Sequence, residues 1–86
     1  ALYLFEATGS DQPGIVRRIS AVFAGVRANV ESLDTALVPA AFHGTPLFRV
    51  RGQVAVPSSV SIEALRDALE DICAELNLSV DFSPMT

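Results

Sequence analysis

Two stretches with the periodicity of an amphipathic helix, each lying between strand-like segments, constrain the fold of this chain most strongly. Apolar side chains recur every three or four residues in both stretches, as they do along one face of a helix. We expect Ser59 or Ser61 to cap the second helix. The apolar stripes are Ile15, Val16, Ile19, Val22, Phe23 and Val26, and then Ile62, Leu65, Leu69, Ile72 and Leu76.

Four segments around these stripes have the composition and alternation of strands, so the predicted order is strand, helix, strand, strand, helix, strand. Each half is a split βαβ unit, which predicts an α+β, ferredoxin-like βαββαβ domain over residues 1–86. Its four-stranded antiparallel sheet would have the first and third strands at the centre and both helices on one face. The strand segments are Leu2–Thr8, Asn29–Val38, Leu47–Val56 and 78–83, and the predicted core is Phe5, Ile19, Phe23, Val50, Val54, Leu65, Leu69 and Ile72.

The turn after the first strand carries residues that commonly start a helix. Asp11 can accept hydrogen bonds from the free N–H groups of a first helical turn, and Pro13 is tolerated there because it has no N–H group to leave unpaired. We therefore expect Asp11 to cap a helix that begins at about Pro13 and ends near residues 25–28. Gly14 either leaves room for a ligand or lets the helix pack closely on the sheet.

Charge and residue content exclude several kinds of site. The net charge of −4 gives no general attraction for nucleic acid, so we expect no direct nucleic-acid binding. One cysteine, Cys73, and one histidine, His43, cannot form an intrachain disulfide or a zinc cluster, and we expect neither a metal nor a cofactor. No apolar run approaches the roughly 18 residues that cross a bilayer, and the first residues lack a signal peptide, so we expect a cytoplasmic protein without a membrane partner.

The segment Gly9-Ser10-Asp11-Gln12-Pro13-Gly14-Ile15-Val16 resembles the G-x-D-x-P-G-I-V opening of ACT domains. Asn29-Val30 is similar to the Asn-Ile pair that starts the second strand in that family, although Arg27 stands where the family usually has glycine. Residues 44–48, followed by Pro57, are similar to the ACT domains of the glycine cleavage system transcriptional repressor. The resemblance extends over nearly the whole chain.

This resemblance implies a regulatory module without catalytic residues, in which a small amino acid lies between the loop before the first helix and the second strand of a neighbouring copy. The residues suit such a ligand. The backbone N–H groups of residues 14–16 could receive a carboxylate at the helix N-terminus, and Asp11 or Asn29 could accept a hydrogen bond from an ammonium group. The candidate ligand-binding residues are Asp11, Gln12, Pro13, Gly14, Ile15, Val16, Asn29 and Val30.

Two other functions fit the predicted fold. One is an assembly module that dimerises and binds another protein without any small ligand. The other is an enzyme on the same layout, such as an acylphosphatase-like hydrolase, but the sequence lacks a phosphate loop with a paired Arg and Asn. A shared fold cannot choose among these functions, because one fold hosts many of them.

Association into a homodimer or tetramer is expected from the exposed parts of the sheet. The second strand, Asn29–Val38, contains no Lys, Arg or Pro, so its edge is poorly protected against pairing with another strand. We expect the arginines of the outer face to pair with Glu6 or with acids of a partner strand. The outer face is predicted to present Leu2, Leu4 and Leu47 beside Arg49 and Arg51.

Overall fold

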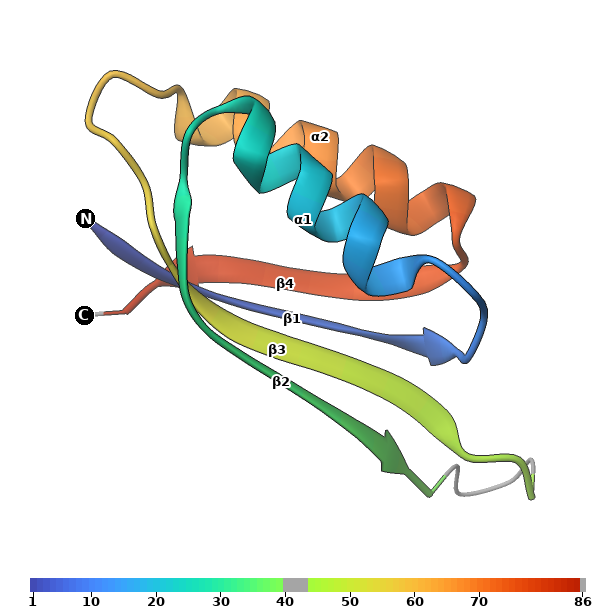
Figure 1. Ribbon diagram of the computed structural model, residues 1–86. Coiled ribbons are helices and arrows are strands. Elements are labelled where there is room, and N and C mark those ends of the chain that lie inside the picture. The colour runs from blue at the N-terminus through green and yellow to red at the C-terminus, as the bar shows by residue number, and fades with distance from the viewer. Residues whose placement is uncertain (40–43, 86) are drawn as a thin grey trace.

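Figure 1 shows the computed structural model, which describes residues 1–39 and 44–85. The four strands form one antiparallel sheet in the order β2-β3-β1-β4, and both helices lie on one face of it (Figure 1). The predicted fold class, the two central strands and the one-sided helix layer are therefore confirmed. The elements are β1 (Leu2–Ser10), α1 (Ile15–Gly25), β2 (Asn29–Val38), β3 (Leu47–Ala55), α2 (Ile62–Glu75) and β4 (Leu78–Pro84).

The core lies between the helices and the inner face of the sheet. In β1, Phe5 and Ala7 point towards the helices and are buried, whereas Leu2 and Leu4 point to the outer face and are exposed. Seven of the eight predicted core residues are buried, and the exception is Ile72, which is only partly buried. Leu65, Leu69 and Cys73 follow one another at four-residue spacing and form the buried side of α2. Ile72 precedes Cys73 by one residue and therefore lies beside this buried side.

The two helix starts differ from each other. Ser61 caps α2, since its hydroxyl accepts a hydrogen bond from the Ala64 N–H at 3.2 Å. Helix α1 begins at Ile15, two residues later than predicted, because Gly14 has φ 86° and so cannot belong to a right-handed helix. Gly14 is itself the cap residue, and no side chain within residues 1–39 and 44–85 caps this helix. The prediction that Asp11 is the N-cap was therefore wrong.

Strand β2 is the least covered part of the sheet. Leu33 and Leu37 lie on the helix side of the sheet, yet they are 42% and 62% exposed. The strand nevertheless lies close to β3, because Gly52 has no side chain where the Ser32 carbonyl approaches it. The C-terminal end of β2 and the N-terminal end of β3 extend beyond the helices in Figure 1.

Candidate ligand-binding site

The predicted ligand residues of the β1–α1 turn surround an open helix N-terminus. Gly14 adopts the left-handed conformation, and a side chain at this position would have no described neighbour within 4 Å. Its role is therefore not close packing of the helix on the sheet. The first intrahelical bond runs from the Arg18 N–H to the Gly14 carbonyl at 2.9 Å, so the N–H groups before Arg18 belong to the unpaired first turn of α1.

Gln12 fixes the position of this turn. Its Nε2 donates to the Leu76 carbonyl at 2.6 Å and to the Ser10 carbonyl at 3.3 Å. Leu76 is the C-cap residue of α2, where carbonyl groups lack partners within the helix, so the amide of Gln12 ties the turn to the neighbouring helix. The side chain of Gln12 thus holds the turn in place, and it is not free to reach a ligand without breaking these bonds.

A hollow of about 460 Å³ lies beside the turn. Asp11 is its charged member, and this carboxylate makes no hydrogen bond or ion pair with residues 1–39 and 44–85. Ile15 and Val16 contribute only backbone to the open helix end, because their side chains pack in or against the core. Besides Asp11, the hollow is lined by Ser10, Thr45, Pro46 and Leu47.

Thr45 and Pro46 were not predicted as part of the site, although they belong to the segment that resembles the repressor domains. The signal that could have found them is strand register. Ser10 lies directly opposite Leu47, so the residues just before β3 must reach the end of β1. His43 lies outside the residues that the structure describes.

The structure does not bring Asn29 and Val30 to this turn within one chain. Asn29 pairs with Ala55, which pairs with Leu2, so it lies at the opposite end of the sheet from Ser10. The Asn29 amide donates a hydrogen bond to the Glu31 carboxylate. Val30 is half-buried against the core. Any shared site therefore needs a second copy, as the resemblance implies.

An ion pair joins the two helices near the turn. The Arg18 guanidinium donates to the Glu75 carboxylate at 3.0 Å, which joins α1 to α2 and neutralises both charges. Burial raises the pKa of the Cys73 thiol, so this thiol stays protonated and packs as a small apolar side chain.

The outer face of the sheet has the side chains that were predicted there. Leu2 and Leu4 are 45% and 40% exposed. Arg51 lies between Glu6 and Asp34 in the strand register, but it forms no ion pair with either of them in the described part of the chain. The prediction placed Glu6 beside Arg51 correctly, but the two side chains do not form an ion pair within one copy. Pairing with acids of a partner strand stays a prediction.

No helix in residues 1–39 and 44–85 is both long enough and apolar enough to span a membrane. The cytoplasmic location stays a prediction.

Solved structures share this architecture over nearly the whole chain. A protein from Galdieria sulphuraria is 32% identical, with a TM-score of 0.86, and the match covers 99% of this chain and 49% of that protein. An ACT domain protein from Streptococcus pneumoniae is 18% identical, with a TM-score of 0.79, and the match covers 95% of this chain and 86% of that one. A candidate glycine cleavage system transcriptional repressor is 16% identical, with a TM-score of 0.77 and coverage of 99% and 46%.

The chain thus spans about half the length of the Galdieria protein. No curated protein matches it. The sequence model of the ACT domain family matches residues 2–83, which include every strand and helix described above except the end of β4. With the βαββαβ order and the glycine-capped turn at Asp11–Gly14, this match shows that the chain belongs to the ACT domain family.

Proposed function

We propose that this chain is a regulatory module that binds a small amino acid at the β1–α1 turn. The observation that carries the proposal is the N-terminus of α1, which no described side chain caps and which lies beside an exposed carboxylate in an open hollow. Gly14 leaves the approach to the helix end free, and Asp11 has no described partner of its own. An amino acid carries a carboxylate and an ammonium group, and the turn offers one complementary group for each.

The carboxylate of the ligand would accept hydrogen bonds from the N–H groups of Ile15 and Val16. These groups belong to the first turn of α1, where the helix dipole also favours a negative charge. The ammonium group would donate to Asp11, which forms a charge-assisted hydrogen bond stronger than a neutral one. A short ligand side chain suits the hollow in front of Pro46, so glycine and serine are the first amino acids to test.

A second copy would complete the site through β2. Val38 lies at the end of the sheet where β1 leads into the ligand turn, and Asn29 lies at the other end. If two copies pair their β2 strands antiparallel, Asn29 of the second copy comes to the end that holds the first copy's ligand turn. The ligand would then favour association, because it binds the dimer more tightly than the monomer.

The test is thermal unfolding in the presence of each amino acid. A ligand at about 100 times its dissociation constant adds about 2.7 kcal/mol to the free energy of unfolding, which raises the midpoint of a domain of this size by roughly 10–20 °C. Asp11→Ala should remove most of this shift while leaving the unliganded midpoint nearly unchanged, because Asp11 does not cap α1. Asp67→Ala is the matched control, since Asp67 is an exposed acid on α2 far from the turn in sequence.

If no amino acid moves the midpoint of the wild-type dimer at millimolar concentration, the ligand proposal fails. The assembly module without a ligand would then be the better account of this domain. Sedimentation at tens of micromolar tests the proposed association of two copies. A protein that stays monomeric with and without amino acids contradicts both the β2 interface and the shared site.

A further inference from the structure

The free edge of β4 is built differently from the free edge of β2. The Met85 N–H donates to the Leu2 carbonyl at 3.1 Å, which fixes which residues of β4 bond to β1. Hydrogen-bonded and non-bonded pairs alternate along an antiparallel ladder. The backbone groups of Val80, Phe82 and Pro84 therefore point away from β1, towards the edge where another strand could add.

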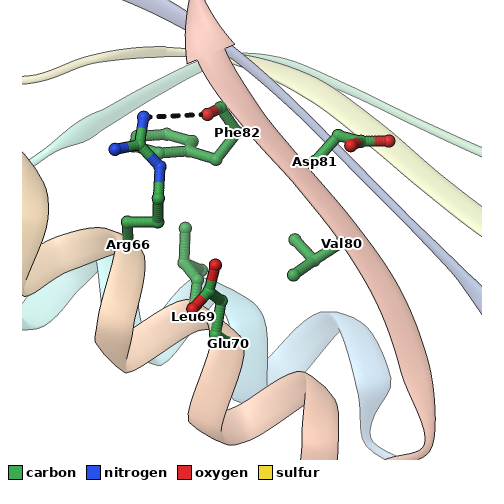
Figure 2. A pocket seen from close by; sticks show the side chains of 6 residues that line it. All are labelled: Arg66, Leu69, Glu70, Val80, Asp81 and Phe82. Carbon is green, nitrogen blue, oxygen red and sulfur yellow. Dashed lines mark hydrogen bonds between the residues drawn. The ribbon is translucent and has the colours of Figure 1, made fainter.

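Arg66 of α2 covers the middle of this edge. Its Nη2 donates to the Phe82 carbonyl at 3.0 Å, and its guanidinium carbon lies 5.7 Å from the centroid of the Phe82 ring. Figure 2 shows the side chain reaching from the helix to the strand, with the hydrogen bond drawn as a dashed line. The small hollow around this contact, of about 190 Å³, is completed by Leu69, Glu70, Val80 and Asp81.

We propose that Arg66 closes the β4 edge, so that this sheet can be extended only at β2. An added strand would need both the N–H and the C=O of each outward-facing residue. At Phe82 the carbonyl is already bonded to Arg66, and the guanidinium stands in the path of a new strand. At Pro84 there is no N–H to donate. Beyond Phe82 towards the C-terminus, the edge therefore offers no complete pairing position before the strand ends.

Strand β2 has no such protection from the residues that the structure describes. The Val56 N–H donates to the Ala1 carbonyl at 2.9 Å, so the even-numbered residues of β3 bond to β1. Leu33, Thr35 and Leu37 lie opposite even-numbered residues of β3, and their backbone groups point to the free edge. Within residues 1–39 and 44–85, no side chain donates to these three carbonyls. One open edge permits a closed pair of copies, whereas two open edges would permit a continuous row of them.

The decisive experiment compares Arg66→Ala with wild type by sedimentation velocity, without any amino acid. At roughly 100 μM, the variant should form species of at least about twice the wild-type mass. Arg17→Ala is the matched control, because it removes the same charge from an exposed side chain on the other helix. Either change takes the net charge from −4 to −5, which opposes association, so a larger species cannot arise from charge loss.

Amide hydrogen exchange shows whether the new contact is at β4. The Phe82 N–H faces the free edge in wild type, and in the associated variant its exchange should slow by about tenfold or more. Arg66→Met keeps the aliphatic part of the side chain over Phe82 and removes the donor, so it decides the question if Arg66→Ala does not fold.

If the folded variants sediment like the wild-type protein, the proposal is overturned. Larger species in which the Phe82 amide stays unprotected from exchange would overturn it as well. Neither result would bear on the amino-acid site, which is tested by ligand-induced shifts in the wild-type protein.

Discussion

Substitutions at Gly14 test two features of the ligand turn separately, namely its left-handed backbone conformation and the free space in front of the helix end. Gly14 has φ 86° and ψ 4°, and a Cβ atom there would meet no described atom within 4 Å. No clash contributes, so the cost of a methyl group at this position is conformational. The left-handed region costs a residue with a side chain about 1–2 kcal/mol, and asparagine tolerates it better than alanine does.

Gly14→Ala should therefore lower the free energy of unfolding by about 1–2 kcal/mol, which corresponds to a fall in the thermal midpoint of roughly 4–16 °C. Gly14→Asn should lower it by less. Gly25→Ala is the matched control in the same helix, because Gly25 also has open space around its Cα but lacks the positive φ. That change should leave the stability unchanged or raise it by up to about 1 kcal/mol.

Urea denaturation of the three variants measures these differences without any ligand. If Gly14→Ala matches wild type within roughly 0.3 kcal/mol, the left-handed cap does not hold the turn and the reasoning is refuted. The ligand part needs a larger side chain. Gly14→Val should abolish the amino-acid shift, while Gly25→Ala should keep it. A full shift in Gly14→Val would show that the ligand does not approach the helix end.

Three further results are expected. Leu69→Ala should lower the free energy of unfolding by about 2–5 kcal/mol, because Leu69 is 1% exposed at the centre of the core. A change below about 0.5 kcal/mol in chemical denaturation would contradict its placement. Gly52→Ala should lower the free energy of unfolding by about 1–3 kcal/mol, since the new Cβ would overlap the Ser32 carbonyl and lie 2.9 Å from the Phe5 ring. An unchanged midpoint in thermal unfolding would argue against the close β2–β3 pairing. Burial raises the pKa of Cys73 above its ordinary value of 9.0, so above about pH 9 the unfolded thiol ionises first and the free energy of unfolding falls as pH rises. Denaturation at about pH 8 and about pH 10 should show a larger fall in wild type than in Cys73→Ala, and equal falls would contradict this placement of the thiol.

Periodicity was sufficient to predict the fold because almost every element buries one face only. The stripe from Ile15 to Val26 and the alternation in β3 each indicate one secondary structure, and the structure has both. Prediction was less exact where backbone conformation decides the outcome. The residues Asp11 to Gly14 suit a helix start, but the sequence does not show that Gly14 adopts a positive φ and displaces Asp11 from the cap.

The site was only partly predictable, because its residues come together through register. The candidate residues of the turn are adjacent in sequence, so one sequence segment was enough to name them. Thr45 and Pro46 join them only because Ser10 pairs with Leu47, and the exact pairing of two strands depends on which faces the whole sheet buries. The closure of the β4 edge could not be inferred either, since Arg66 and Phe82 are sixteen residues apart on different elements.

The position of Asn29 at the far end of the sheet determines whether the proposed ligand promotes association of two copies. If the ligand needed only Asp11 and the helix end, each copy would bind it alone, and binding would leave association unchanged. If Asn29 of a second copy contacts the ligand, the two binding events are thermodynamically linked. The ligand then raises the affinity between the copies by the same factor by which pairing raises the affinity for the ligand. The closed edge at Arg66 would then confine this coupling to one interface, so that the ligand changes the fraction of paired copies and does not promote longer assemblies.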